Sequence, residues 1–98
     1  MVTDEEVAAA LGMSLIQCQN NLIDGDFFDL VKAGVREKWC DKEKGRSVCV
    51  NYSQEETEVC LWNEIEFYDE GGEYSFPSEL DCWKEALVWL DKKEKKDA

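Results

Sequence analysis

The segment between Arg46 and Lys84 holds ten acidic residues and no basic one, and it carries the side chains best placed to do chemistry. Residues two apart on a β-strand lie on one face of a sheet, about 6.6–6.8 Å from each other. Carboxylates at that spacing, interrupted by Trp62 and Tyr68, form a negative surface with aromatic anchors. Such a surface suits a basic protein partner, because charge steers association and aromatic rings supply affinity. The expected partner-binding residues are Glu55, Glu56, Glu58, Trp62, Glu64, Glu66, Tyr68, Asp69, Glu70 and Glu73.

An acidic sheet face can also serve solubility alone, without binding anything. A face of that kind normally mixes lysine with glutamate, whereas this segment excludes lysine and arginine over its whole length. An exposed tryptophan among carboxylates is also more typical of an interface than of a solvated surface. The pattern therefore favours an interaction surface.

The composition gives no support for a catalytic or metal site. There is no histidine, which removes the commonest general base and a common zinc ligand. The five cysteines contain no Cys-x-x-Cys pair, and Asp24-Gly25-Asp26 lacks the spacing of an EF-hand calcium loop. No glycine-rich phosphate loop or nucleophile elbow occurs. We therefore expect a protein that is not an enzyme and that carries no cofactor and no metal.

The cysteines are expected to be reduced thiols of a cytoplasmic protein. The chain starts with an acidic stretch instead of a secretory signal, and no apolar run approaches the ~20 residues of a membrane span. A reducing compartment keeps thiols free. Cys49 and Cys60 fall opposite each other in the strand register given below, so a cross-strand disulfide is geometrically possible and stays an alternative.

The 98 residues are expected to form one domain over residues 1–91, followed by a charged tail over residues 92–98. The formal net charge of −12 disfavours nucleic acid and anionic membranes as direct partners, because binding to phosphates needs clustered lysine and arginine. The charge is also uneven, since residues 1–31 hold no base whereas residues 32–46 hold six bases against three acids. A basic protein surface is therefore the expected partner.

Residues 1–34 predict two or three short helices. The signals are N-cap residues followed by apolar residues at helical spacing, with glycine at the ends. The N-caps are Thr3 (with Glu6 completing a capping box), Ser14 and Asp26. The helices end near Gly12, Ile23 and Gly34.

The first two of these helices resemble the helix-turn-helix pattern of DNA-binding proteins over about twenty residues. Val7, Ala8, Cys18 and the turn at 11–14 take the positions where that motif packs. The resemblance implies a second helix whose amide side chains could read adenine edges. Because the first base of the chain is Lys32, nothing nearby could contact phosphates, and a plain helical hairpin is favoured.

From Val35 the pattern changes to period two, which predicts a four-stranded antiparallel meander. The expected strands are residues 35–40, 46–52, 57–68 and 73–76, joined by turns at 42–45, 53–56 and 69–72. Four-residue turns give one consistent apolar face, as a stable register requires. Its expected pairs are Trp39 with Val48, Val48 with Leu61, Val50 with Val59, Phe67 with Tyr74 and Ile65 with Phe76. A bulge is expected near Trp62 and Asn63, because twelve residues is long for a strand.

A C-terminal helix should cover the apolar face of this sheet. Pro77 ends the last strand and Ser78 can cap the helix. The helix carries an apolar stripe at helical spacing, formed by Leu80, Trp83, Ala86, Leu87 and Leu90. The expected fold is therefore α+β, with two to three short N-terminal helices, a four-stranded antiparallel β-meander and a C-terminal helix packed on one sheet face.

These features predict a small acidic protein-binding inhibitor. In size, charge and acid-lined sheet the chain resembles the phage and mobile-element proteins that imitate nucleic acid. The resemblance implies that it blocks a basic nucleic-acid-binding protein, such as a nuclease, a restriction enzyme or a CRISPR effector. An immunity protein or antitoxin that neutralises a basic toxin is the first alternative, and a helix-turn-helix-like regulator is the second. We expect a monomer or a weak dimer, since Arg36, Lys38 and Pro77 oppose pairing through a strand edge.

Overall fold

The computed structural model describes residues 2–63, 68–76 and 78–97, and at 21–24, 63, 68–76 and 97 it describes the backbone alone. The chain folds as α+β, with an antiparallel sheet whose strands follow one another in the order β1-β2-β3. The elements are α1 (Asp4–Leu11), α2 (Leu15–Asp24), α3 (Phe27–Trp39), β1 (Arg46–Tyr52), β2 (Thr57–Asn63), β3 (Tyr68–Phe76) and α4 (Glu79–Asp97).

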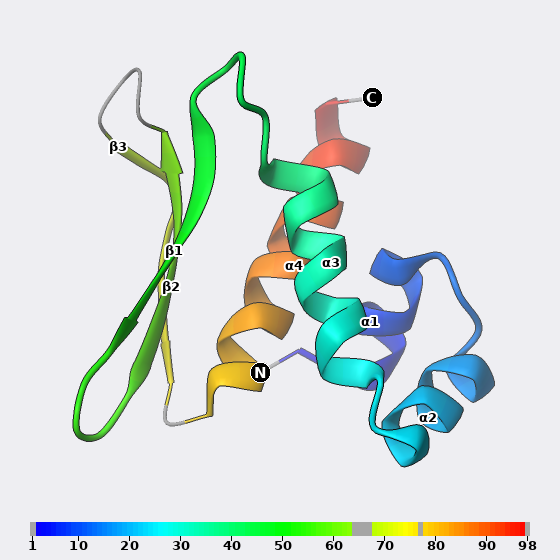
Figure 1. Ribbon diagram of the computed structural model, residues 1–98. Coiled ribbons are helices and arrows are strands. Elements are labelled where there is room, and N and C mark those ends of the chain that lie inside the picture. The colour runs from blue at the N-terminus through cyan, green and yellow to red at the C-terminus, as the bar shows by residue number, and fades with distance from the viewer. Residues whose placement is uncertain (1, 64–67, 77, 98) are drawn as a thin grey trace.

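The elements lie in layers, with the sheet on one side, α3 and α4 in the middle, and α1 and α2 on the far side (Figure 1). Helix α4 packs on β2 and β3, and α3 packs on β1. Helix α1 contacts both α3 and α4 without reaching the sheet in this view (Figure 1). One face of the sheet is therefore covered by the middle layer.

Helices α1 and α2 begin with the caps that the sequence predicts, whereas Asp26 precedes α3 without a side-chain capping hydrogen bond. The Thr3 side chain accepts a hydrogen bond from the Glu6 backbone N–H at 3.2 Å, and Glu6 Oε1 accepts one from the Thr3 N–H at 3.1 Å. Ser14 and Gln17 repeat this reciprocal pair at the start of α2, at 3.2 and 3.0 Å. Gly12 ends α1 with a φ of 71°, a left-handed conformation that glycine adopts without strain.

Helix α3 corrects the prediction of a first strand at residues 35–40, which is wrong. Val31, Val35 and Trp39 lie at positions i, i+4 and i+8 and are at most 2% exposed, so they form one buried helical stripe. Gly34, the predicted end of this helix, lies inside it instead. A Cβ atom there would lie 3.0 Å from Leu11 Cδ2 and 3.1 Å from Leu87 Cδ1. Glycine thus lets three helices approach closely.

The pairing of β1 with β2 confirms the predicted register residue by residue. Val48 lies opposite Leu61, Cys49 opposite Cys60, and Val50 opposite Val59. The sheet has three strands within the described ranges 2–63, 68–76 and 78–97, because the segment expected to form the first of four is helical. Trp39 still reaches β1, since its Nε1–H donates to the Ser47 carbonyl at 2.7 Å.

Strand β3 corrects the predicted turn at 69–72, because these residues are part of the strand. Tyr74 pairs with Val59 instead of Phe67. The pairs Cys60–Glu73 and Trp62–Asp69 leave one residue of β2 opposite three of β3, so an irregularity lies close to the bulge that the sequence predicts. The segment 64–67, with the expected partners Ile65 and Phe67, lies outside the described residues.

Helix α4 covers the inner face of the sheet, as its apolar stripe predicts. Trp83, Leu87 and Leu90 are at most 3% exposed, and they pack in one core with Val59 and Leu61. The helix continues to Asp97, through the segment predicted as a charged tail. In the part of the chain that the structure describes, no helix combines the length and the apolar character needed to cross a bilayer.

Candidate functional site

The outer face of the sheet, defined as the side turned away from α3 and α4, is the surface on which the sequence places the site. Strand alternation puts every second residue of β1 and β2 on it. None of the four described helices covers this side (Figure 1). Its members in these two strands are Ser47, Cys49, Asn51, Glu58, Cys60 and Trp62.

Glu58 is held in place by its neighbours on the outer face. Cys60 Sγ donates a hydrogen bond to Glu58 Oε1 at 3.0 Å, and Asn51 Nδ2 donates to the same oxygen at 3.2 Å. The Cys60 hydrogen bond, followed by the one from Asn51, holds the pKa of Glu58 below its ordinary value. The carboxylate is therefore ionised at neutral pH and fixed in orientation.

Two further predicted acids lie at the tip of the β1–β2 hairpin. Glu55 and Glu56 are exposed in the turn that joins the strands. The Ser53 hydroxyl closes this turn, because its oxygen accepts from the Glu56 N–H at 3.1 Å and donates to the Glu56 carbonyl at 2.9 Å. The Ser53 N–H also donates to that carbonyl at 2.9 Å. The turn thus carries adjacent carboxylates on an ordered backbone.

The remaining predicted residues belong to β3 or to the segment before it. The backbone register places Glu73 opposite Cys60 and Asp69 opposite Trp62, so β3 brings two more acidic positions beside the row formed by β2. Tyr68 pairs with Asn63, and Glu70 falls in the irregular part of the ladder. Glu64 and Glu66 lie outside the described residues. The structure thus gathers Glu58, Trp62, Asp69 and Glu73 along adjacent strands, with Glu55 and Glu56 at one end.

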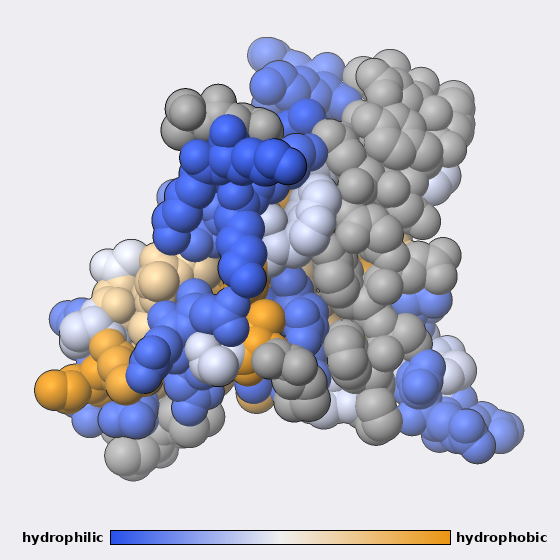
Figure 2. Space-filling view, turned by 180° about the vertical axis from the view of Figure 1, so that it is seen from behind, coloured by the Kyte–Doolittle hydropathy of each residue, from blue (hydrophilic) through white to orange (hydrophobic). Residues whose placement is uncertain are grey.

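Several lysines of the helices pair with acids of the helices. Lys38 Nζ lies 3.0 Å from Glu94 and 3.7 Å from Asp91, and Lys95 Nζ lies 2.8 Å from Asp91. Lys92 pairs with Glu6 at 2.9 Å, which raises the pKa of the lysine and lowers that of the glutamate. Figure 2 shows hydrophilic residues gathered over the end of the molecule where α4 finishes. The charges of Lys38, Lys92 and Lys95 are therefore balanced by carboxylates of the helices.

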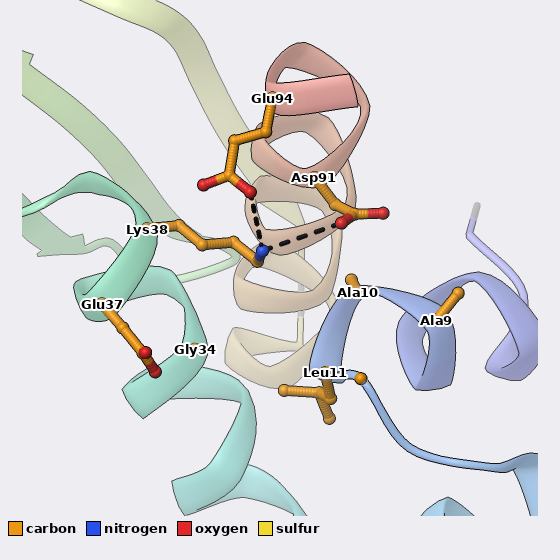
Figure 3. A pocket seen from close by; sticks show the side chains of 9 residues that line it. Ala9, Ala10, Leu11, Gly34, Glu37, Lys38, Asp91 and Glu94 are labelled. Atoms are coloured by element: carbon orange, nitrogen blue, oxygen red, sulfur yellow. Dashed lines mark hydrogen bonds and ion pairs between the residues drawn. The ribbon is translucent and has the colours of Figure 1, made fainter. Parts of the chain in front are cut away.

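A hollow of about 490 Å³ lies between α1, α3 and α4, and sequence reasoning missed it. Figure 3 shows the Lys38 ammonium between Asp91 and Glu94, with Gly34 on α3 and Ala10 on α1. The strand predicted at residues 35–40 contains Lys38, and a strand does not bring this side chain beside Asp91 and Glu94. The Lys38 charge is balanced by the carboxylates of Asp91 and Glu94, and these ion pairs join α3 to α4. The alanine and glycine residues that also line the hollow carry no side-chain group that could act on a ligand.

No protein-family model, curated protein or solved structure matches the chain. Among the residues described, no group of three or more histidine, cysteine or acidic side chains is arranged to hold a metal ion. The outer face is therefore assigned as the candidate site from its own geometry and charge.

Proposed function

We propose that the chain is a small acidic inhibitor that binds a basic nucleic-acid-binding protein by imitating nucleic acid. The contact surface consists of the outer face and the β1–β2 turn. One observation carries the proposal: residues 47–76, which form most of the sheet, hold eight acidic residues and no base, whereas Lys38, Lys92 and Lys95 pair with acids of the helices.

The chemistry of such a partner follows from the carboxylates. A protein that binds phosphates presents clustered lysine and arginine side chains, and carboxylates on a rigid scaffold can replace the phosphates. Glu58 is already ionised, and Cys60 and Asn51 hold its side chain in one orientation. Its side chain therefore loses little conformational entropy on binding. The half-buried Trp62 on the same face supplies an aromatic anchor.

A competition experiment tests this function. Proteins retained by the immobilised chain at low salt are identified by mass spectrometry, and each is then titrated with the chain in the presence of its nucleic acid. We expect direct competition and an affinity that falls steeply as salt increases. A partner that binds the chain and its nucleic acid together would contradict mimicry and would support the immunity-protein alternative.

A charge-reversal pair locates the contact surface. We expect Glu55→Lys with Glu56→Lys to weaken binding roughly tenfold or more, because two steering carboxylates become repulsive. The control, Glu5→Lys with Glu43→Lys, changes two exposed acids of α1 and the 42–45 turn and alters the net charge equally. Equal losses in both variants would show that net charge, and not this surface, drives binding.

A further inference from the structure

The outer face carries two cysteines directly opposite each other on β1 and β2, and neither of them is in a disulfide. We infer that Cys49 and Cys60 are a redox-sensitive pair, which a small-molecule disulfide such as oxidised glutathione converts into a disulfide between the two strands. This reaction requires no partner protein, so it does not depend on the proposed function.

The register places the pair within bonding range. Residues directly opposite in an antiparallel ladder have Cα atoms about 4.5 or 5.5 Å apart, according to their hydrogen-bonding position. Both separations lie inside the range of about 4.4–6.8 Å found for disulfides. The neighbouring cross-strand pair on the same face, Asn51 and Glu58, is already in side-chain contact at 3.2 Å. Side chains of β1 and β2 therefore meet on this face.

The two thiols differ in a way that sets the order of reaction. Cys49 is exposed, whereas Cys60 is 6% exposed and donates its S–H to the Glu58 carboxylate. A carboxylate that accepts this hydrogen bond stabilises the protonated thiol, and the thiolate is the nucleophile. Cys49 is therefore the sulfur that attacks the small disulfide, and Cys60 resolves the product.

The reaction balances in two exchange steps. The Cys49 thiolate attacks one sulfur of oxidised glutathione, the glutathione S–S bond breaks, and one glutathione leaves as a thiolate that takes up a proton. Cys60 then loses its proton to water and attacks Cys49 Sγ in the mixed disulfide. The second glutathione leaves and is protonated. The two protein thiols are oxidised to one disulfide, and one oxidised glutathione is reduced to two thiols.

Peptide mapping of the whole chain tests the inference. The protein is incubated in mixtures of oxidised and reduced glutathione, its free thiols are alkylated, and it is cleaved after glutamate. Trypsin would leave both cysteines in one peptide, because no lysine or arginine lies between Arg46 and Lys84. Cleavage at Glu55, Glu56 or Glu58 separates them instead. We expect a Cys49–Cys60 cross-linked pair of fragments that separates on reduction.

Other outcomes overturn the inference. Persistent glutathione on Cys49 with Cys60 still free, alkylation of both thiols, or a Cys49–Cys40 cross-link would each do so. Cys40 is the natural comparison, because it is also exposed and lies directly after α3. The matched control Cys40→Ser should leave the Cys49–Cys60 cross-link unchanged.

Two variants examine the order of the steps. Cys60→Ser should stop the reaction at glutathione bound to Cys49. Glu58→Gln should shorten the lifetime of that mixed disulfide several-fold, because it removes the charge that keeps Cys60 protonated. A mixed disulfide on Cys60 in the wild-type chain would reverse the assigned order. Circular dichroism checks that each variant is folded, and the wild-type map decides the pairing even if a variant is not.

Discussion

The inner and outer faces of the sheet are built from alternate residues of the same strands, yet they meet different surroundings. On the inner face, Val59 and Leu61 are completely buried beneath the helices. On the outer face, Asn51, Glu58 and Cys60 form a polar hydrogen-bonded group that none of the described helices covers. One backbone register therefore produces an apolar face in the core and a polar face on which Cys49 and Asn51 are exposed and Cys60 is buried.

The contrast separates the residues that stabilise the fold from those that are available for binding. Burial of apolar area supplies most of the folding free energy, and here it depends on inner-face positions. Outer-face positions can change their chemistry at small cost in stability, because most surface substitutions shift stability by less than about 0.5 kcal/mol. Stability measurements on matched variants can therefore test how completely the two roles are separated.

The largest expected effect comes from the inner face. Leu61→Ala should lower the free energy of unfolding by about 2–5 kcal/mol, because it leaves a cavity against α4. The outer-face control Cys49→Ala should change it by less than about 0.5 kcal/mol. Urea denaturation of both variants measures the difference. Similar losses in the two variants would mean that the outer face is also part of the core.

An intermediate effect is expected from two buried cysteines, one in the helix that covers the inner face and one on the outer face of the sheet. Cys82 of α4 is fully buried, and its S–H donates to the Thr57 carbonyl at 2.9 Å. Cys82→Ala should therefore cost about 1–2 kcal/mol, whereas Cys60→Ala should cost less than about 1 kcal/mol. Thermal unfolding of the two variants ranks them. The opposite ranking would assign the larger structural role to the outer face.

The smallest effect is a dependence on pH. The pKa of Glu58 is lowered in the folded state, so its ionised form stabilises the fold above the ordinary value of 4.5. This contribution is lost as the pH falls below 4.5 through the lower folded value. Stability measured across that range should depend less on pH in Glu58→Gln than in the wild type. The Glu6–Lys92 pair shifts the pKa of Glu6 in the same direction, so Glu6→Gln serves as the comparison.

The hairpin of β1 and β2 was predictable because two local signals agree there. Val48 and Val50 alternate with polar residues, as do Val59 and Leu61, and a polar turn of four residues separates the strands. Because strand period and turn length fix the register together, the pairs follow without any knowledge of the tertiary structure. The caps of α1 and α2 were predictable for a similar reason, since they depend on residues three apart.

The end of α3 was not predictable from the same signals. Val35 and Trp39 are four apart, a spacing that fits both one helical face and one face of a strand. Gly34 then suggested a helix end, as isolated glycines often do. Its actual role depends on α1 and α4, which approach it from distant parts of the sequence. A longer window starting at Val31 would have favoured the helix.

The prediction of where β3 begins and how it pairs with β2 was wrong for a different reason. Asp69-Glu70-Gly71-Gly72 is a strong hairpin signal, but paired glycines also suit an irregular part of a ladder. The predicted pairs of Tyr74 and Phe76 differ from the observed ones by eight residues along β2. Side chains of a strand alternate between the two faces of the sheet, so a shift by an even number of residues leaves each residue on its predicted face. This is why Glu73 still lies beside the row that contains Glu58 on the candidate site.

The position of α4 determines how cooperatively the chain folds. This helix packs on α3, β2 and β3 and also contacts α1. The Val2 N–H, just before α1, donates to Glu85 Oε1 at 3.2 Å. The other helices and the sheet cannot bury all of their apolar surface before α4 docks, because Val59, Leu61, Val31 and Val35 share one core with Trp83 and Leu87 of this helix. We therefore expect a single all-or-none unfolding transition. During synthesis, the segments before α4 should keep apolar surface exposed to chaperones until α4 has left the ribosome.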